Sequence, residues 1–447
     1  MLDEAHPFFQ VVAADVAPEN ITKNQPTPVL GKTINRLVSE SRKKVALFSP
    51  KTTSNKDVLS HSECARWLLT FQGYTGVFDK TKFRNRTYDT SKGWLFDIGG
   101  LFLEGNNLFE TFMLNLILLH PEPQYQGTQQ NPCWEYSSSE MIQSCFSGRD
   151  YDNLAALYTN WSRALYIDPD IDFREPFRCG VVKMPAIKQN DNFIEPMTLW
   201  QFNKSGSNKN KNTYTPRKHQ VNQAIWRSFG LLSLPNSYES NQRQPGIIAW
   251  MNKVTSTIGE YDLTLHAVSM KDDGNTNSRL PVDEATDQLN INDFILTDIQ
   301  KNGWVLRIYD VVKETKNIVV ESIYKQFLMD IKEIRQAKVG DDKKNKKYFQ
   351  KIMNSSFVNE EVEKLYYQIN QPFNQWLSAL KPSDSKDERI FEWRKKLRII
   401  VLEQAENLVQ NAGPRDYTGI VVNDKIKNIA TAYNSFIYFL NQQLYVT

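Results

Sequence analysis

The acidic run near residue 170 is the part of this sequence that comes closest to a metal site. Asp168, Asp170 and Asp172 occupy alternate positions, so on a strand their carboxylates would point the same way, towards a divalent cation. The pattern of a calcium-binding loop is not completed, because Phe173 stands at its glycine position and Cys179 at its bidentate acid position. We therefore predict no metal site here.

The other residues that could do chemistry form no catalytic pattern. The five histidines are scattered, and none belongs to a Cys/His cluster or to a His-Glu-x-x-His helix. The sequence contains no Gly-x-x-x-x-Gly-Lys-Ser/Thr loop, no Gly-x-Gly-x-x-Gly fingerprint and no Gly-x-Ser-x-Gly segment. We therefore predict that the protein is not an enzyme and needs no cofactor.

Cations gather in three stretches, at residues 32–51, 80–94 and 204–218. The second stretch alternates cations with aromatic residues. It contains Lys80, Lys82, Arg84, Arg86 and Lys92 together with Phe83, Tyr88 and Trp94. Lysine and arginine neutralise nucleic-acid phosphates, and exposed aromatic rings stack on bases. The stretches predict contact with nucleic acid, and a merely solvated loop is the alternative for each of them.

Overall composition indicates a globular protein without a strong charge. The 447 residues exceed what one hydrophobic core usually supports, which favours two domains. Hydrophobic residues make up 40% of the chain, charged residues 23%, and the formal net charge is +3, so a nucleic-acid site must be local. The longest apolar run, residues 112–119, is too short to span a bilayer. We predict a soluble, cytoplasmic protein with no membrane partner.

Four amphipathic helices are expected in the last third of the chain. Apolar residues recur there every three or four positions in four segments. The stripes are Val320, Ile323, Phe327, Ile331 and Ile334; Val358, Val362, Leu365, Ile369, Phe373, Trp376, Leu377 and Leu380; Ile390, Trp393, Leu397, Ile400, Val401 and Leu408; and Ile426, Ile429, Tyr433, Phe436, Ile437 and Leu440. Such faces are buried against one another, so we predict a four-helix bundle at residues 311–447.

A region of mixed character, residues 1–305, precedes these helices. Residues 261–270 alternate apolar and polar positions like a half-buried strand, and residues 303–310 favour a second strand. Helical patterns occur near residues 60–70, 106–119 and 220–233, without regular strand-helix alternation. The fold class that we predict is α+β, with a mixed N-terminal α/β domain of irregular topology followed by the C-terminal four-helix bundle.

Five short motifs become informative through their order along the chain. They are His6-Pro7-Phe8, Leu103-Glu104-Gly105, Asn131-Pro132-Cys133-Trp134-Glu135, the run from Tyr158 to Asp168, and Trp226-Arg227-Ser228-Phe229-Gly230. Each of them alone fits an ordinary packing role. Trp134 and Trp161 would lie in a core, and Arg163 and Arg227 would each cap or pair within it. In this order and at these separations they resemble the CasA family, the large subunit of the type I-E CRISPR surveillance complex Cascade. The resemblance covers nearly the whole chain.

The resemblance implies a non-catalytic subunit that reads the protospacer-adjacent motif (PAM) in double-stranded target DNA. Such a subunit helps to open the duplex for guide RNA pairing and presents a helical bundle to the recruited CRISPR helicase-nuclease. The implied partners are the other Cascade subunits, the guide CRISPR RNA, the target DNA and that helicase-nuclease. The family loop that anchors the subunit near the 5′ end of the guide corresponds to residues 43–54, where the candidate contacts are Lys43, Lys44, Leu47 and Phe48.

The glycine-rich PAM loop of the family falls between Gly73 and Gly93 of this sequence, which departs from the family pattern. Glycine is sparse there, and four cations fill the space, which favours contact through side chains over close backbone approach. The candidate DNA-binding residues of this loop are Lys80, Lys82, Arg84 and Arg86.

Two further elements of the family have candidates in this sequence. The lysine that family members insert into the minor groove precedes an acidic-proline pair, which resembles Glu195-Pro196 here, so Lys183 is the first candidate and Lys188 the second. The hairpin tip that wedges into the duplex corresponds to residues 274–277, and its candidate wedge residues are Asn275, Thr276 and Asn277.

One departure from the family concerns the amino end, because family members carry a substantial segment ahead of His-Pro-Phe, whereas this chain starts five residues before His6. We therefore expect an N-terminally truncated PAM-recognition domain. Two other functions stay open at this point. A helical scaffold or interaction protein would not bind DNA of its own, and a nuclease would depend on the acids between Asp168 and Glu175.

Overall fold

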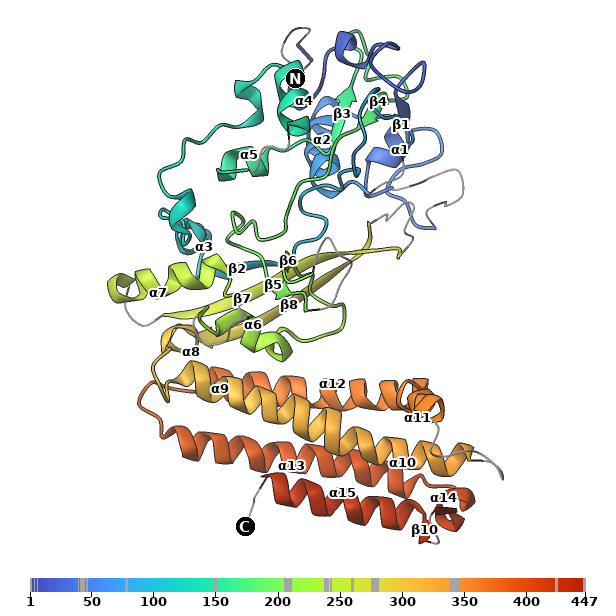
Figure 1. Cartoon of the computed structure of the whole chain (residues 1–447), viewed down its shortest axis with the longest axis vertical. Helices are drawn as coiled ribbons and strands as arrows, with labels where there is room; N and C mark the ends of the chain where they lie inside the picture. The colour runs from blue at the N-terminus through green and yellow to red at the C-terminus, as the bar shows by residue number, and fades with distance from the viewer. Residues whose placement is uncertain are drawn as a thin grey trace.

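The computed structural model describes residues 2–3, 5, 7–38, 40, 45, 47–76, 79–147, 151–204, 211–236, 241, 243–258, 261–274, 281–337, 346–422 and 425–444. Three layers follow one another along the long axis in Figure 1: a small sheet with its helices, a second sheet, and a group of long helices. This mixture of sheet and helix confirms the α+β class.

The first layer is built on an antiparallel sheet of three strands in the order β1-β4-β3. Its elements are η1 (Ala13–Val16), β1 (Thr27–Leu30), α1 (Gly31–Ile34), α2 (His61–Tyr74), η2 (Pro123–Tyr125), η3 (Cys133–Glu135), α4 (Ser138–Phe146), α5 (Leu154–Tyr158), β3 (Arg163–Tyr166) and β4 (Arg178–Lys183). Successive side chains of a strand point to opposite faces. Paired Ala164 and Val182 therefore pack into one apolar cluster, and paired Leu165 and Val181 pack into another with α2.

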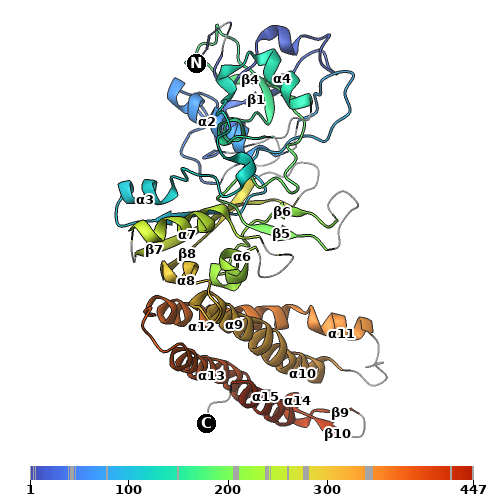
Figure 2. The same cartoon turned by 60° about the vertical axis from the view of Figure 1, so that its left-hand side comes forward.

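The second layer holds another antiparallel sheet, with the order β2-β7-β8. Its elements are β2 (Gly100–Glu104), α3 (Leu108–Asn115), β5 (Trp200–Phe202), β6 (Tyr214–Pro216), η4 (Ile225–Ser228), α6 (Phe229–Ser233), α7 (Gly246–Ile258), β7 (Asp262–Asp272), β8 (Pro281–Asn292) and α8 (Phe294–Thr297). Strands β7 and β8 form a long hairpin, in which β7 confirms the strand expected at residues 261–270 and β8 was not expected from the sequence. Figure 2 shows α3 and α7 on one flank of this sheet.

The third layer consists of long helices and one short hairpin. Its elements are α9 (Trp304–Lys313), η5 (Glu314–Tyr324), α10 (Lys325–Gln336), α11 (Lys346–Met353), α12 (Ser356–Ser378), α13 (Lys386–Gln410), α14 (Pro414–Thr418), β9 (Ile420–Val422), β10 (Lys425–Lys427) and α15 (Ile429–Leu444). Helix α10 packs against α12 and α15, and α13 packs against the same two helices. The four apolar stripes therefore lie almost entirely on helices that contact one another.

Two local predictions are wrong. Residues 303–310, expected as a strand, begin helix α9, in which Val305, Ile308 and Val312 are buried at helical spacing. Short apolar runs do not distinguish strand from helix, and here Asp298 accepts a hydrogen bond from the Trp304 N–H at 2.8 Å and so starts the helix. Ile426, placed on the last helical stripe, lies in β10 and is exposed.

A single cluster of buried apolar side chains joins the second and third layers. It extends from Leu101 on β2 to Leu444 at the end of α15. At the junction, the Trp226 ring stacks on Phe373 with 4.5 Å between ring centroids, and its indole N–H donates to Asn370 Oδ1 at 3.0 Å. The boundary between residues 305 and 311 stays a prediction. Among the described residues, no helix is long and apolar enough to cross a membrane.

Candidate nucleic-acid interface

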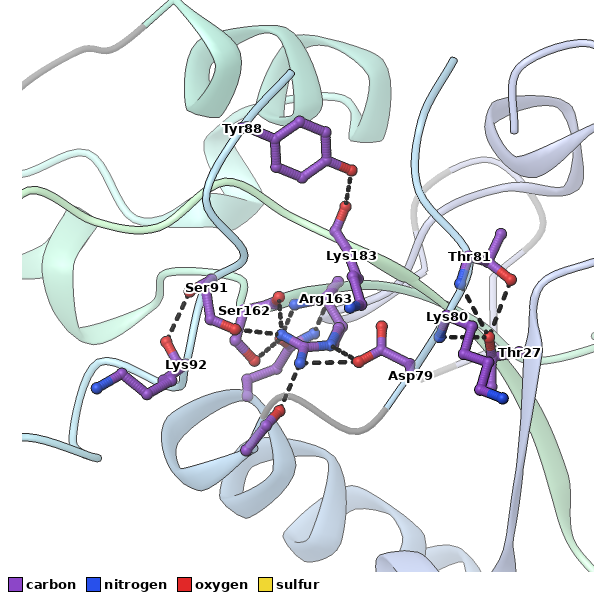
Figure 3. Close-up of polar contacts among 12 residues, drawn as sticks. Thr27, Asp79, Lys80, Thr81, Tyr88, Ser91, Lys92, Ser162, Arg163 and Lys183 are labelled. Atoms are coloured by element: carbon purple, nitrogen blue, oxygen red, sulfur yellow. Dashed lines mark hydrogen bonds and ion pairs between the residues drawn. The ribbon is translucent and has the colours of Figure 1, made fainter. Parts of the chain in front are cut away.

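A buried ion pair fixes the segment that carries the second basic stretch. Arg163, the first residue of β3, and Asp79 are both fully buried, and Arg163 Nη2 lies 2.9 Å from Asp79 Oδ1 (Figure 3). The same guanidinium donates to the carbonyl oxygens of Gly76 at 2.5 Å and of Ser91 at 2.7 Å. Burial lowers the pKa of Arg163, and the Asp79 carboxylate opposes that shift. One side chain thus holds both ends of the stretch between residues 76 and 91.

Helix α2 holds the same arginine from the other side. The Arg163 backbone N–H donates to Gln72 Oε1 at 3.0 Å, and Gln72 Nε2 donates back to the Arg163 carbonyl at 3.0 Å. Trp161 and Ser162 are buried as well. The Trp-Ser-Arg triplet therefore acts inside the protein, and it positions the basic stretch instead of contacting a ligand.

Thr27 of β1 fixes the start of the cationic run. Its hydroxyl oxygen accepts from the backbone N–H groups of Lys80 and Thr81, at 3.3 Å and 3.2 Å (Figure 3). These bonds hold the backbone while the Lys80 side chain remains exposed. Neither Thr27 nor Asp79 was singled out from the sequence, because isolated polar residues in loops show no spacing that reveals their partners.

Lys82 and Lys183 come from two separate candidate groups, and the structure brings them together. The two residues are the partners of a parallel β-bridge, and the Lys183 N–H donates to the Thr81 carbonyl at 3.0 Å. The Tyr88 hydroxyl donates to the Lys183 carbonyl at 2.8 Å and accepts from the Phe83 N–H at 3.1 Å. Tyr88 therefore ties the basic stretch to the end of β4.

The cations of this interface differ in how freely they reach solvent. Lys80, Arg84 and Arg86 are exposed, whereas Lys82 and Lys183 are half-buried. Burial lowers the pKa of Lys183, Asp79 opposes this, and the positive charges of Arg163 and Lys82 add to the lowering. An anion such as a phosphate beside Lys183 would favour its charged form.

Some of these side chains have partners within the protein. The Arg84 guanidinium donates to the Ile21 carbonyl, the Lys82 ammonium lies 5.4 Å from the centre of the Tyr88 ring, and Arg86 lies 4.3 Å from the centre of the Phe146 ring. The Lys80 side chain is exposed, and the residue is held through its backbone N–H, which donates to Thr27.

The aromatic residues of the basic stretch make contacts within the protein. Phe83 is buried in the first layer, and Trp94 stacks on Tyr158 with 5.0 Å between ring centroids. The expectation that exposed aromatics alternate with the cations is therefore wrong for Phe83, whereas Trp94 is half-buried.

Lys188 lies on the exposed loop after β4, and the side chain of Asn192 donates to its carbonyl at 3.4 Å. In the third basic stretch, Lys218 is engaged within the protein. Its ammonium lies 3.2 Å from Asp272 Oδ2 and 4.3 Å from the centre of the Phe96 ring. Residues 205–210 of that stretch lie outside the described residues.

The proposed guide-anchoring loop is described in part. Leu47 and Phe48 are 88% and 89% exposed, whereas Lys43 and Lys44 lie outside the described residues. The base of the loop is fixed, because Lys51 Nζ lies 2.9 Å from Glu63 Oε1 on α2. Two large apolar side chains are therefore exposed on a loop whose base is fixed. Such exposed apolar side chains are typical of a surface that a partner covers.

The hairpin β7–β8 is regular up to the region of its tip. Met270 pairs with Glu284, and Lys271 Nζ lies 3.6 Å from Asp283 Oδ2 across the strands. Gly274 has a φ of 68°, a left-handed conformation that favours glycine. The candidate wedge residues Asn275, Thr276 and Asn277 lie outside the described residues.

In the acidic run at residues 168–172, the carboxylates of Asp168 and Asp172 bind neighbouring groups of the same loop. Asp168 Oδ1 accepts from the Asp170 N–H at 3.1 Å, and Asp172 pairs with Arg174 at 2.8 Å. Within the described part of the chain, no group of three or more His, Cys, Asp or Glu side chains is placed to hold a metal ion.

Glu195, the acidic residue of the acidic-proline pair, carries a buried carboxyl group. Its Oε1 accepts from the Met197 N–H at 2.8 Å and from the Tyr158 hydroxyl at 3.4 Å, and its Oε2 is buried without a hydrogen bond. Burial raises the pKa of Glu195 to about 7, and those two hydrogen bonds oppose the shift. The residue holds the segment after Lys188 against α5.

Comparisons with known proteins agree with this fold. The family model described as CRISPR-associated protein Cse1 matches residues 1–404. The crystal structure of Thermobifida fusca Cse1 matches with a TM-score of 0.70 and 20% identity, over 99% of this chain and 79% of that one. The structure of Thermus thermophilus CasA (Cse1) matches with a TM-score of 0.59 and 16% identity, over 99% and 78%.

A third solved structure, described as a CRISPR RNA-guided surveillance complex, contains a chain that matches with a TM-score of 0.58 and 15% identity, over 97% of this chain and 77% of that one. No protein with a curated description matches the sequence. At these identities the solved structures establish the fold, and the family model, which spans most of the sequence, establishes the family. The chain belongs to the CRISPR-associated protein Cse1 family.

Proposed function

We propose that this chain is the non-catalytic large subunit of a type I-E CRISPR Cascade surveillance complex and that it recognises the PAM in double-stranded target DNA. The observation that carries the proposal is the pairing of Lys82 with Lys183, on a segment that the buried Asp79–Arg163 pair holds in place. A rigid backbone that carries several cations can meet phosphates and groove edges without first becoming ordered. The family membership and the likeness to a surveillance-complex chain support the same conclusion.

In this proposal the cations divide into two roles. Exposed Lys80, Arg84 and Arg86 neutralise phosphates, which sets affinity and orientation but not sequence preference. Lys183, held by its backbone and only half exposed, reaches into the minor groove beside the PAM. Lys188, on the loop that follows, is the second candidate for that role.

The remaining elements complete the proposed subunit. Residues 43–54 contact the guide CRISPR RNA and neighbouring subunits, with Leu47 and Phe48 as apolar anchors. Residues 275–277, at the tip of the β7–β8 hairpin, wedge into the duplex so that guide pairing can begin. Residues 1–305 form the PAM-recognition domain, and residues 311–447 form a four-helix bundle that helps to recruit the helicase-nuclease. The complex acts in the cytoplasm.

One observation favours the alternative of a scaffold without DNA binding of its own. Several cations of the three basic stretches are already paired with acids, as Lys51 is with Glu63, Lys92 with Asp97 and Lys218 with Asp272. Paired cations of this kind contribute little to phosphate binding, because their charge is already balanced. The two proposals therefore differ in whether the cations near Lys183 contact DNA.

The deciding experiment uses the assembled complex with its guide RNA and this chain. Binding is measured to duplexes that match the guide and carry a library of flanking sequences. We expect flank-dependent binding that Lys183→Ala weakens, whereas Lys396→Ala, an exposed lysine on α13, leaves it unchanged. Binding that ignores both the flank and this chain would favour the scaffold, and DNA cleavage abolished by Asp170→Ala would indicate a nuclease.

A further inference from the structure

Helix α3 and the segment after it expose a row of large apolar side chains. Six of them are between 46% and 76% exposed: Leu108, Phe109, Phe112, Met113, Leu116 and Leu118. Only Leu114 of this helix is buried in the core that the second and third layers share. We call these six side chains the α3 ridge. Contiguous exposed apolar surface of this kind marks interaction sites in soluble proteins.

Polar bonds join Leu114 in holding the α3 ridge in its position. Asn115 on α3 accepts from the Leu103 N–H of β2 at 2.9 Å and donates to the Leu103 carbonyl at 2.6 Å. Thr111 Oγ1 accepts from the Gly105 N–H at 3.1 Å, and Asn107 caps the helix by accepting from the Glu110 N–H at 3.0 Å. The helix is therefore fixed to the sheet edge by its polar residues, and its apolar residues face solvent.

The charge around the α3 ridge restricts what can cover it. Between Lys92 and Arg149 the sequence contains no lysine or arginine, whereas Glu104 and Glu110 flank the start of the helix. The Glu104 side chain is 51% exposed beside His266. The neighbouring helix α7 contributes one exposed cation, Lys253. An apolar surface with an acidic border attracts a partner whose apolar surface has a basic border.

Three other occupants fit the α3 ridge poorly. Nucleic acid requires cations near the contact, and this stretch of sequence supplies none. Helices that lie on membranes carry lysine and arginine on their polar face, and α3 has neither. A second copy of the chain would bring one acidic border against another, which costs free energy when the borders are desolvated.

We propose that the α3 ridge is the docking site for another protein subunit of the surveillance complex, through an apolar segment flanked by lysine or arginine. The identity of the partner rests on the proposed function, whereas the existence of a docking surface rests on the ridge itself. Phe109 and Phe112 are the anchors, because large aromatic side chains contribute most of the binding energy at such interfaces.

The test titrates labelled chain into the complex of the remaining subunits with guide RNA. We expect the double variant Phe109→Ser with Phe112→Ser to raise the Kd at least tenfold. A matched double variant, Leu69→Ser with Ile399→Ser, removes two other exposed apolar side chains on helices and should change the Kd less than threefold. Equal thermal unfolding midpoints of both variants and the wild type confirm that each of them folds.

A charge variant tests the nature of the partner. Glu104→Lys should raise the Kd several-fold at low salt, and the difference should shrink as the salt concentration rises. A Kd that stays within threefold of the wild type in the ridge variant would overturn the proposal. Self-association of the wild type that the ridge variant abolishes, without a change of Kd, would assign the ridge to a second copy instead.

The outcomes separate this proposal from the proposed function. Lys183→Ala should keep the wild-type Kd for the complex while it loses flank-dependent DNA binding. A ridge variant that fails to bind the complex, together with a Lys183→Ala variant that still discriminates flanks, would support docking and overturn PAM reading through Lys183. A wild-type chain that does not bind the complex at all would overturn both proposals.

Discussion

Asp79 and Arg163 are 84 positions apart in the sequence, and they form an ion pair at 2.9 Å with both side chains fully buried. Arg163 also binds the carbonyl oxygens of Gly76, Ser91 and Ser162. The pair thus belongs to a network that specifies the path of the basic stretch over β3 and β4. A buried charge that loses its partner destabilises the fold, so mutation of either residue should measurably lower the free energy of unfolding.

We expect Asp79→Ala to lower the free energy of unfolding by roughly 3–5 kcal/mol, because it leaves the buried Arg163 charge without its counter-ion. The double variant Asp79→Leu with Arg163→Met removes both charges and should recover a large part of that loss. Chemical denaturation of the three proteins measures both effects. As a control, Asp172→Ala removes an exposed ion pair and should leave the unfolding midpoint unchanged.

Glu195 should make stability depend on pH. Its pKa in the folded protein is about 7, above the ordinary 4.5, so the folded state holds a proton that the unfolded state releases between these values. This contribution of Glu195 to stability, about 3 kcal/mol, is fully present below pH 4.5 and is lost as the pH rises to 7.

Glu195→Gln should remove this dependence and make the protein more stable than the wild type at pH 8. Chemical denaturation at pH 5 and pH 8 measures the difference, with Glu403→Gln, an exposed residue of α13, as the matched control. Equal pH dependence in the wild type and in Glu195→Gln would show that the buried carboxyl does not titrate in this range.

Salt dependence should reveal which cations meet phosphates. Each lost contact with a duplex phosphate reduces the slope of log K against log salt by about 0.9. We expect Lys80→Ala to reduce the slope by about one contact and to weaken all sequences alike. Lys183→Ala should instead weaken preferred flanks more than others. An unchanged slope in Lys80→Ala would mean that this exposed lysine faces away from DNA.

Arg227 should stabilise the junction between the second and third layers. Its Nη1 lies 2.9 Å from Glu363 Oε2, and its guanidinium lies 3.5 Å from the centre of the Tyr366 ring on α12. Lysine cannot stack or bind in this way, so Arg227→Lys should cost roughly 1–2 kcal/mol of unfolding free energy. Arg66→Lys, at an exposed position of α2, should have a much smaller effect in the same denaturation measurement.

Sequence patterns predicted the fold class and the C-terminal helices because helical burial leaves a regular trace. Val358, Leu365 and Phe373 are buried on α12 at the spacing that the sequence shows. The start of α9 was missed because its short apolar run fits both a strand and a helix, and the choice depends on the capping of Trp304 by Asp298.

The candidate site was predictable as a set of cations but not as an arrangement. Lys82 stood out by charge and Lys183 by the family resemblance, whereas their pairing depends on Tyr88, Thr27 and Asp79, which bind across long separations in sequence. Whether Phe83 and Trp94 are exposed was also beyond the sequence, because burial of a loop aromatic is decided by distant elements such as α5.

The cluster that joins Leu101 to Leu444 affects how this protein can be made in the cell. A ribosome adds about 5–20 residues per second, so the apolar face of β2 emerges tens of seconds before the last helix of its core has been synthesised. During that interval the nascent chain exposes apolar surface that only later residues can cover. Synthesis should therefore depend on chaperones that bind nascent chains, and release from the ribosome should be followed by a late, cooperative closure of the core.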